Sequence, residues 1–314
     1  MYAFAIDSFG TSPQLRELPV PTPGPGEIQI KVRAAGVNPL DWKIADGQLA
    51  ESGAPATFPL TLGINVAGQV TAVGPGVEAF GPGDEVFGMA WPHTFGHGSF
   101  AEYMTAPHDT ARALRPEDLD PVSAAALPMT GGTALAALDW LEIKEGETLL
   151  IIGGVGSYAV QQARARGARV IATAAADNHP YARSLGAAEV IDHRTTDVAD
   201  AVAAAHPDGI DAVLDLANDR DTLAGRIAPL LRKGGRLVST VFAADPEALA
   251  AHDVTAVNFF YRAAPGDMTR LADLVASGDL RVAEPTAYPL TQITDAYTTS
   301  TGGHVRGKLV ITAH

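Results

Sequence analysis

The 314-residue sequence contains no cysteine, which excludes disulfide bonds, thiolate nucleophiles and every zinc site built from cysteine ligands. It also lacks an uninterrupted apolar run of about eighteen residues, so no membrane-spanning helix is predicted. The opening stretch "MYAFAIDSFG" has no basic segment followed by an apolar run, and no secretion signal is expected there. These absences favour a cytoplasmic protein with no membrane partner.

Basic residues are scarce relative to acidic ones, with 22 Lys and Arg against 36 Asp and Glu and a net charge of −14. A surface of this sign repels a phosphate backbone, so we expect no nucleic-acid partner. The ordinary explanation of the charge is solubility. With 46% hydrophobic residues the chain is expected to be globular, and its length is enough for two domains.

The first part of the chain predicts short β-strands separated by glycine and proline turns. "EIQIKVRAAG" (27–36) alternates apolar and polar residues, as a half-buried strand does. "AGQVTAVGPGVEAFGPGDEVFG" (67–88) is cut by Gly-Pro turns, and "GSFAEYMTA" (98–106) predicts a further strand. This pattern is typical of a distorted β-barrel.

The pattern changes near residue 117, where an alanine- and leucine-rich helical stretch begins. Apolar strands then alternate with helical segments, which predicts an α/β fold with a parallel sheet covered by helices on both faces. A helix at 267–277 and short strands at 281–289 and 307–312 close the chain. The alternating elements are strands at 148–152, 168–174, 189–191, 211–215 and 235–241, and helices at 155–166, 179–186, 197–205 and 220–232.

The stretch "TLLIIGGVGSYAVQQARARGARVIATA" (148–174) combines a buried strand, a glycine turn, a helix and a second strand. Such a turn lets the backbone approach a ligand, and the free N–H groups of the helix start attract a pyrophosphate. The first glycine of a G-x-G-x-x-G spacing is missing, so a plain strand-to-helix turn is the alternative. The residues expected to hold the dinucleotide here are Gly153, Gly154, Val155, Gly156 and Ser157.

The end of the second strand of this unit is expected to select the cofactor. Sites for NAD place Asp or Glu there, where the carboxylate accepts from the ribose 2′-hydroxyl. Three alanines (174–176) occupy the place in this chain, and Asp177 comes late, so NADPH is favoured over NADH. The alternative is that the polar residues that follow are ordinary surface residues of the next helix. The candidate contacts are Thr173, Asn178, His179 and Arg183.

Several stretches, taken together and in order, resemble the medium-chain dehydrogenase/reductase superfamily, in its zinc-free, quinone oxidoreductase-like branch. The resemblance implies a GroES-like β-barrel catalytic domain (1–118 and 265–314) and an inserted Rossmann domain (119–264), with the substrate in a cleft against the nicotinamide. Because relatives are often dimers, a homodimer is possible. The stretches are "AAGVNPLDWK", "FPLTLGINVAGQVTAVGPGV", "FGPGDEVFG", "GSFAEY", "AAALPMTGGTAL", "GVGSYAVQQA", "SLGAAEVID" and "GKLVI".

Both zinc sites of the zinc-dependent relatives are missing from the sequence. Asn38 stands where those relatives have a cysteine, and Gly63, Ile64 and Asn65 stand where they have Gly-His-Glu. The four-cysteine structural lobe is also absent. "HTFGH" spaces two histidines by four residues, but its Gly and Phe indicate a loop. We therefore expect no bound metal.

The resemblance also suggests residues around the nicotinamide. Asn38 is expected to hold the nicotinamide ribose or a substrate oxygen, and Lys43 to reach the cofactor or stabilise negative charge. A surface ion pair is the alternative for Asp41 and Lys43, and core packing is the alternative for Trp42. A helix cap is the alternative for Thr130. The positions that match the family near the cofactor are Thr130, Val241, Phe242, Phe259 and Lys308.

The chain departs from the family pattern in ways that bear on its function. The glycine turn is shorter, and no tyrosine is found within residues 45–59, where relatives often carry a proton donor. The proton source is left open between water, exchange by the substrate itself, His93 and His97. Without a Lewis acid, alcohol oxidation is hard, whereas a quinone or an enone is already electrophilic. The sequence predicts an NADPH-dependent reductase of quinones or α,β-unsaturated carbonyls. A non-catalytic NADPH-binding redox sensor or structural homologue is the alternative.

Overall fold

The computed structural model describes residues 1–48, 55–90, 95–109, 112–153, 156–302, 305 and 307–313. The chain splits into two compact units. Unit 1 comprises Met1–Gly132, Ala263–Ser277 and Val282–His314, and unit 2 comprises Thr133–Arg262 and Gly278–Arg281. The candidate residues Gly154, Val155 and His93 lie outside the described residues. No helix in the described part of the chain is long and apolar enough to cross a membrane.

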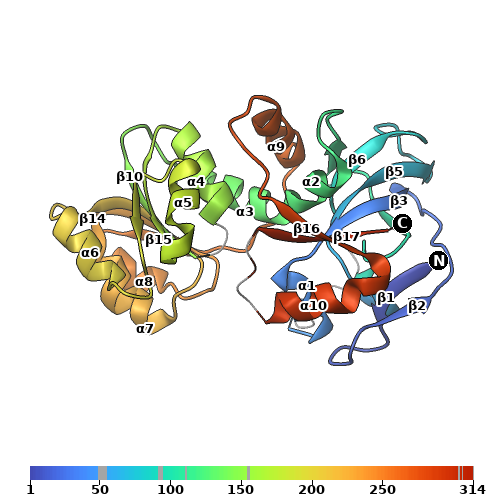
Figure 1. Ribbon diagram of the computed structural model, residues 1–314, viewed down its shortest axis with the longest axis horizontal. Helices are drawn as coiled ribbons and strands as arrows, with labels where there is room; N and C mark the ends of the chain where they lie inside the picture. Colours follow the sequence, from blue (N-terminus) through green and yellow to red (C-terminus); the bar gives the residue numbers. More distant parts are fainter. Residues whose placement is uncertain are drawn as a thin grey trace. The chain divides into compact units, whose positions relative to one another are not determined.

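Unit 1 is built from two sheets with few helices (Figure 1). One sheet has the strand order β2-β1-β4-β7, and the other has the order β16-β17-β3-β5-β6-β9, with β8 also pairing with β3. The strands are β1 (Tyr2–Ile6), β2 (Gln14–Glu17), β3 (Glu27–Gly36), β4 (Ala56–Thr61), β5 (Asn65–Val73), β6 (Glu85–Met89), β7 (Phe95–His97), β8 (Tyr103–Pro107), β9 (Arg112–Leu114), β16 (Pro285–Pro289) and β17 (Lys308–Thr312). The helices are α1 (Pro39–Ala45), α2 (Pro121–Ala126), α3 (Pro128–Trp140, which runs into unit 2), α9 (Asp267–Ala276) and α10 (Ile293–Thr301).

The last strand of the chain completes the sheet that the third strand begins. β17 pairs antiparallel with β3, with Val310 opposite Gly36 and Ile311 opposite Ala35. β3 is predicted correctly from its alternation, because its even-numbered residues from Ile28 onward are buried. The pairing brings the start of β17 next to the residues that follow β3. This register positions the candidate site of unit 1.

Unit 2 contains a parallel sheet with the strand order β12-β11-β10-β13-β14-β15. Renumbered from β10, this order is 3-2-1-4-5-6, the arrangement of dinucleotide-binding α/β folds, in which the ligand lies at the carboxyl ends of the strands. The elements are β10 (Thr148–Ile152), α4 (Gly156–Ala165), β11 (Arg169–Thr173), α5 (His179–Ser184), β12 (Glu189–Ile191), α6 (Val198–Ala205), β13 (Ile210–Asp215), α7 (Arg220–Thr222), β14 (Leu231–Ser239), α8 (Pro246–Ala250) and β15 (Thr255–Asn258).

The core of unit 2 explains why its strands have no alternating pattern. Leu150, Ile171 and Val213 point to one face of the sheet, where they pack with residues of α6 and α8. Their strand neighbours, such as Leu149 and Ile151, must point to the opposite face and are equally buried. A sheet covered on both faces therefore needs continuous apolar strands.

The segment predicted as one helix over 220–232 is divided in the structure. A single turn, α7, leads into a π-helical stretch (Leu223–Ile227) and a 3-10 turn (Ala228–Leu230), and β14 already starts at Leu231. Pro229 explains the break, because its ring removes a donor and clashes with the preceding turn. The predicted strand over 281–289 is shortened to β16, and α8 and α10 were not predicted.

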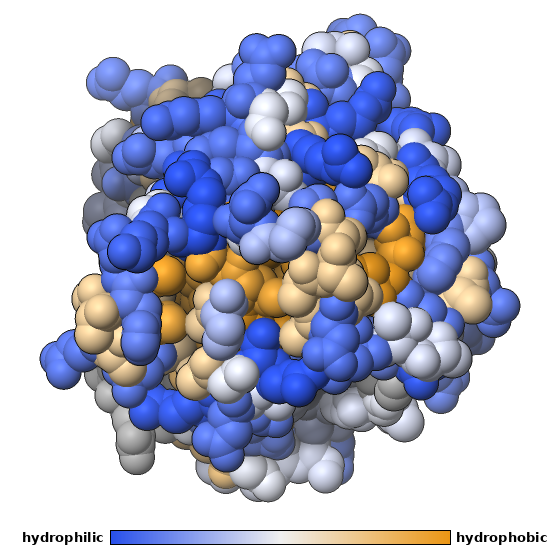
Figure 2. All heavy atoms as spheres, turned by 90° about the vertical axis from the view of Figure 1, so that its left-hand side faces the viewer, coloured by the Kyte–Doolittle hydropathy of each residue, from blue (hydrophilic) through white to orange (hydrophobic). Residues whose placement is uncertain are grey.

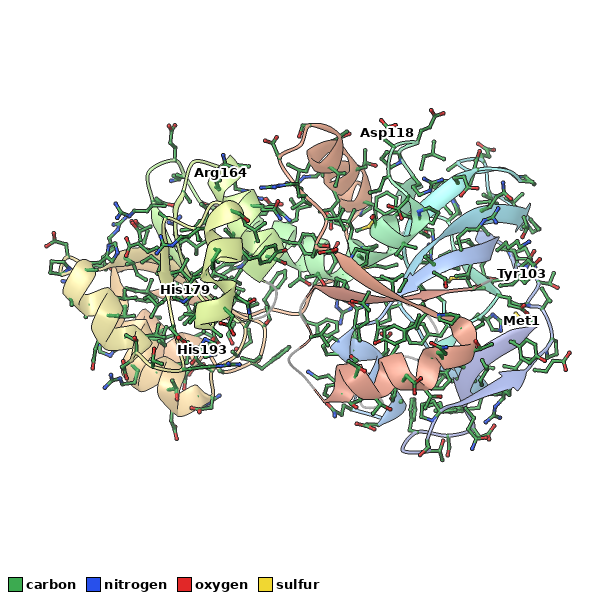
Figure 3. All side chains as sticks on the ribbon, in the orientation of Figure 1. Met1, Tyr103, Asp118, Arg164, His179 and His193 are labelled. Atoms are coloured by element: carbon green, nitrogen blue, oxygen red, sulfur yellow. The ribbon has the colours of Figure 1, made fainter. Side chains whose placement is uncertain are left out.

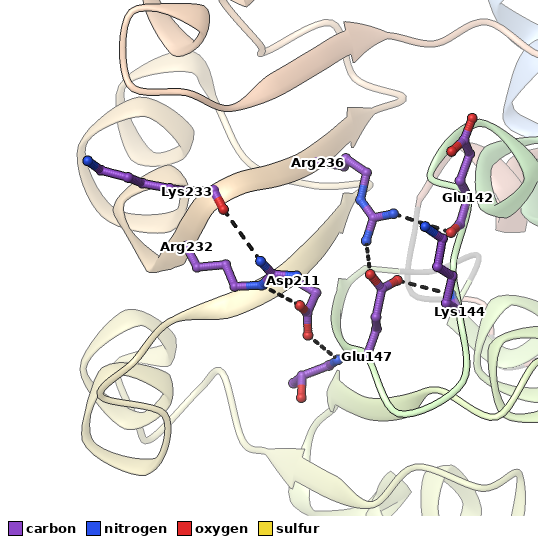
Figure 4. A network of polar contacts seen from close by, with 8 residues as sticks. Glu142, Lys144, Glu147, Asp211, Arg232, Lys233 and Arg236 are labelled. Atoms are coloured by element: carbon purple, nitrogen blue, oxygen red, sulfur yellow. Dashed lines mark hydrogen bonds and ion pairs between the residues drawn. The ribbon is translucent and has the colours of Figure 1, made fainter.

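A network of charged side chains ties together the amino ends of three strands of unit 2 (Figure 4). Glu147 accepts from Arg236 Nη2 at 2.6 Å and from the Lys144 backbone N–H at 3.0 Å. Asp211 accepts from the Thr148 N–H at 2.7 Å and from Arg232. These bonds lie at the edge of the sheet opposite to the carboxyl ends, so we assign them to stability.

The face of the molecule that carries α6, α7 and β14 is mainly hydrophilic, with apolar side chains gathered in a strip across its middle (Figure 2). Among the described residues of unit 2, the exposed large apolar side chains are those of Val241 and Phe242. Both follow β14, at the carboxyl edge of the sheet.

Candidate functional site

The first part of the site is the start of α1 in unit 1. Pro39 occupies the first helical position, which suits its fixed backbone angle and missing N–H. The carboxylate of Asp41 reaches back to the backbone N–H of Asn38, at 2.7 Å from Oδ2. This bond satisfies a donor that the helix start leaves open, and it fixes the backbone of Asn38. Asn38 and Asp41 are both buried.

Lys308, at the start of β17, contacts the same turn. Its Nζ donates to Asn38 Oδ1 at 2.7 Å and to the Val37 carbonyl at 2.9 Å. Asn38 Nδ2 donates to the Gly36 carbonyl at 3.1 Å. The structure therefore brings together Asn38, Asp41 and Lys308, three of the predicted site residues. Lys308 lies in unit 1, as Asn38 does, and its predicted contact with the cofactor stays a prediction.

Burial determines the charge states of this cluster. It raises the pKa of Asp41 to about 7, although the backbone amides of Asn38 and Ile64 and the charge of Lys308 partly oppose it. Burial lowers the pKa of Lys308 to about 8, with Asp41 opposing the shift. Within the described residues, Asp41 Oδ1 has no hydrogen-bond partner. Both pKa values therefore lie close to neutral pH, that of Asp41 above its usual range and that of Lys308 below its usual range.

Lys43 is separated from this cluster. Its side chain is exposed, and its Nζ lies 5.6 Å from the centre of the Trp42 ring, a cation–π contact. The alternative of a surface ion pair between Asp41 and Lys43 is wrong, because Asp41 is fully buried. Trp42 is half-buried. The predicted role of Lys43 toward a cofactor stays a prediction.

Asn65, which replaces an acidic residue of relatives, is a structural bridge. Its Nδ2 donates to the Ala125 carbonyl at 3.0 Å, and its Oδ1 accepts from the Met129 N–H at 3.2 Å. The side chain thus joins the end of α2 to the start of α3. An amide can donate and accept in this way, whereas an ionised carboxylate has no donor. No local sequence pattern indicates this role, because the partners are far apart along the chain.

Asn65→Asp is expected to lower the free energy of unfolding by about 1–3 kcal/mol, because the buried Ala125 carbonyl loses its donor and faces a carboxylate. Thermal and urea denaturation measure the loss. Asn178→Asp makes the same chemical change at a half-buried side chain with no cap hydrogen bond, and should leave stability nearly unchanged. Equal stability of Asn65→Asp and wild type would contradict the bridging role.

The glycine turn of unit 2 stands at the carboxyl end of β10. Gly153 has φ +108°, a conformation that favours glycine, and an added Cβ would lie 3.0 Å from Leu216 Cβ and 3.2 Å from Ala217 Cβ. Gly156 starts α4, and its N–H donates to the Gly153 carbonyl at 3.2 Å. Ser157 lies in the first turn of α4. The N–H groups at such a helix start can bind an anion.

The end of β11 carries the residues predicted to select the cofactor. Thr173 ends the strand, Asn178 lies at the start of α5, and His179 lies within hydrogen-bond distance (3.1 Å) of the Ala174 carbonyl through Nε2. Arg183 is exposed one turn further along α5, on the same face as His179. Asp177 is exposed. No carboxylate lies between Thr173 and Ala176.

Sequence reasoning missed the residues that follow the neighbouring strand β12. The Ala174 N–H donates to the Ile191 carbonyl, so the ends of β11 and β12 lie together. Asp192 follows β12, and its pKa is lowered mainly by the Arg194 backbone, with His179 and His193 also contributing. Figure 3 shows His179 and His193 in the same region of unit 2. That these residues lie near the end of β11 follows from the strand order of the sheet, which no local sequence pattern shows.

A second missed feature joins the carboxyl ends of β13 and β14. Asp215 is fully buried and accepts from Ser239 Oγ at 2.9 Å, from Asn218 Nδ2 at 2.7 Å and from the Asn218 N–H at 3.1 Å. Ser239 Oγ in turn accepts from the Ala243 N–H at 3.2 Å. The network anchors both loops at the ligand edge of the sheet. An acidic residue ending a buried apolar strand was the available signal.

The remaining candidates near the cofactor lie as follows. Phe242 has φ +62° and is 54% exposed, which is uncommon for an aromatic residue, and Val241 before it is also exposed. Phe259 follows β15, and its N–H donates to the Ser239 carbonyl. Thr130 is the third residue of α3 and therefore lies inside the helix, not at its cap. Their contacts with a cofactor stay predictions.

In the part of the chain that the structure describes, no group of three or more His, Asp or Glu side chains is placed to hold a metal ion. Asn38 and Asn65, at the positions of zinc ligands in other branches, are engaged in protein hydrogen bonds. Among the histidines, His97 is exposed, with its Nδ1 lying 2.8 Å from Thr105 Oγ1.

The strand order of unit 2, with a glycine turn at the end of its first strand, defines a dinucleotide-binding α/β fold of the oxidoreductase type. Two family models match the chain. The model described as "Alcohol dehydrogenase GroES-like domain" covers residues 24–116, and the model described as "Zinc-binding dehydrogenase" covers residues 185–311.

Individual relatives match nearly the whole chain. A "Chloroplast envelope quinone oxidoreductase homolog" of Arabidopsis thaliana is 32% identical over 333 residues, covering 99% of this chain and 98% of the relative. An "NADPH-dependent alkenal/one oxidoreductase, chloroplastic" of the same plant is 30% identical over 328 residues, covering 99% and 79%. The structure of the quinone oxidoreductase from Coxiella burnetii matches with a TM-score of 0.88 at 30% identity, covering 100% and 99%.

The chain belongs to the medium-chain dehydrogenase/reductase superfamily, as a quinone oxidoreductase-like member. The predicted fold class is confirmed: unit 1 carries the GroES-like part, and unit 2 carries the Rossmann-like parallel sheet. The protein is thus an oxidoreductase of this family, whose members bind a nicotinamide cofactor. The description "zinc-binding" belongs to the family model, whereas this chain has Asn38, Ile64 and Asn65 at the ligand positions.

Proposed function

We propose that the protein is an NADPH-dependent reductase of quinones or α,β-unsaturated carbonyls that works without a metal ion. The observation that carries this proposal is the state of the two asparagines at former ligand positions. Asn38 and Asn65 are buried, and their amide oxygens already accept hydrogen bonds from protein groups, so neither oxygen is free to bind a metal ion. The named activities of the relatives support the substrate class.

The residues of unit 2 fit a phosphorylated nicotinamide dinucleotide. Gly153 has a backbone conformation that favours glycine and packs closely against Leu216 and Ala217, and α4 begins three residues later with N-terminal N–H groups that can bind an anion. His179 and Arg183 supply basic groups near the end of β11, and no carboxylate lies within residues 173–176. Asp192, which follows the neighbouring strand β12, interacts electrostatically with His179. The bound cofactor supplies the hydride.

The chain's own residues in unit 1 bind and orient the acceptor in this proposal. A quinone or enone oxygen gains negative charge as it is reduced, and a fixed N–H donor stabilises that charge. The Asn38 amide is such a donor, held by Lys308 on one side and the Gly36 carbonyl on the other. Alcohol oxidation, which needs a lowered alcohol pKa, is the disfavoured direction.

Cofactor selection is tested by Ala174→Asp, which places a carboxylate at the end of β11. Repulsion of the 2′-phosphate is expected to weaken NADPH binding about tenfold or more relative to NADH. Calorimetric titration with each dinucleotide measures both affinities. Ala188→Asp is the matched control, because this exposed alanine precedes β12 at the opposite edge of the sheet. An unchanged preference in Ala174→Asp would refute the assignment of this strand end.

The partners and location proposed for the protein are tested separately. We propose a small-molecule substrate, no nucleic-acid partner and a cytoplasmic location, with a homodimer as the possible assembly. The two Arabidopsis relatives are named as chloroplast proteins, which describes those proteins. A gel shift at low salt tests for nucleic-acid binding, cell fractionation tests the location, and light scattering tests the homodimer.

A further inference from the structure

The Asn38 carboxamide is held from two directions within unit 1. Lys308 Nζ lies 2.7 Å from its Oδ1, and the Gly36 carbonyl lies 3.1 Å from its Nδ2. A lysine ammonium has donors only, so the atom facing it must be the amide oxygen. The orientation of this amide is therefore determined by chemistry, without the usual ambiguity between oxygen and nitrogen.

We propose that Lys308 is a positioning residue that keeps the side-chain oxygen of Asn38 turned toward its own ammonium group. The amide hydrogen that is not bonded to Gly36 is then the only side-chain group that Asn38 can offer to an acceptor. This inference rests on the proposed reductase function and deepens it. The amide nitrogen has two hydrogens, and one is used by Gly36. Within the described residues, the other has no hydrogen-bond partner. Asn38 can thereby donate to a ligand acceptor atom, such as a quinone or enone oxygen, while its own oxygen is held by Lys308.

The surroundings of Lys308 support this role. Its side chain is 9% exposed and donates to the Val37 carbonyl as well, so two bonds fix the ammonium. Asp41 lies on the other side of Asn38 and bonds the Asn38 backbone N–H. Asp41 thus fixes the backbone of Asn38, and Lys308 fixes its side chain. A buried lysine is costly to desolvate, and an apolar residue would fill the same space without that cost.

A double-mutant cycle in the full-length protein tests whether Lys308 acts through Asn38. Asn38→Ala is expected to lower kcat about 100-fold, and Lys308→Met about tenfold or more, with NADPH affinity unchanged by calorimetry. In the Asn38→Ala background, Lys308→Met should cost no further activity beyond about twofold. Independent, multiplicative losses would overturn the proposal, and so would an unchanged kcat in Lys308→Met.

A spectroscopic measurement tests the same point without catalysis. The chain has five asparagines, so selective 15N-asparagine labelling gives few side-chain amide signals, and Asn38→Ala identifies the pair from Asn38. The pair should shift in Lys308→Met and in Lys308→Gln, which serves if the methionine variant does not fold. An Asn38 pair that stays in place in the folded variant would refute the positioning role.

The two measurements separate this inference from the proposed function. If the wild type reduces no acceptor but the Asn38 signals depend on Lys308, the reductase proposal fails and the hold on Asn38 stands. If the wild type reduces quinones or enones while the cycle is multiplicative and the signals do not move, the positioning role fails alone.

Discussion

Asp215→Ala is expected to lower the free energy of unfolding by about 3 kcal/mol and to weaken NADPH binding at least about tenfold. The carboxylate is fully buried and accepts from Ser239 and from both the side chain and the backbone of Asn218. Its removal leaves buried donors without an acceptor. It also releases the loop at Leu216 and Ala217, against which the glycine turn packs at Gly153.

Glu147→Ala is the matched control for this variant. Glu147 also accepts charge-assisted bonds in unit 2, from Arg236 and the Lys144 backbone, but at the amino edge of the same sheet. Its loss should cost about 1.5–3 kcal/mol of stability without a change in NADPH affinity. Urea denaturation and calorimetry separate the two effects. Equal NADPH affinity in both variants would contradict our placement of the ligand at the carboxyl edge.

Gly153→Ala is expected to weaken NADPH binding about tenfold or more and to lower stability by about 1–3 kcal/mol. The glycine has φ +108°, and the new methyl group would lie 3.0 Å from Leu216 Cβ, tighter than a normal contact. The turn must therefore shift, and the N–H groups at the start of α4 shift with it. Thermal melts with and without NADPH measure both quantities.

Gly146→Ala isolates the effect of crowding from that of backbone strain. Gly146 has φ +82°, and no heavy atom lies within 4 Å of an added Cβ. This variant should lose about 1 kcal/mol of stability and keep its NADPH affinity. If Gly153→Ala behaves in the same way as Gly146→Ala, the glycine turn is an ordinary strand-to-helix turn and our cofactor assignment there is wrong.

Local pattern predicted most elements of unit 2, because its central strands β10 and β13 are largely buried on both faces, whereas the edge strand β15 is only half-buried and was not predicted. The strands at 148–152 and 189–191 match β10 and β12 at both ends. The prediction of a single helix over 220–232 was wrong, because Pro229 interrupts it and the preceding residues form a π-helical stretch. Short helices such as α8 carry too few residues for a periodic pattern.

The candidate site was predictable only where its residues are neighbours in sequence. Gly153 and Gly156 form one turn, and the chain order alone brings them together. Lys308 and Asn38 meet because β17 pairs with β3, which no local pattern shows. Asp215 and Ser239 meet because β13 and β14 are adjacent in the sheet. Long-range pairing, not composition, decides such contacts.

The most direct test of the central claim uses protein dialysed against a chelator and checked for residual metal. NADPH is mixed with a panel of quinones and enones, and the loss of NADPH absorbance is followed before and after chelation. We expect oxidation of NADPH with at least one acceptor, at a rate that chelation does not change. NADPH that raises the melting temperature but is oxidised by no acceptor would contradict the claim and identify a non-catalytic binding protein.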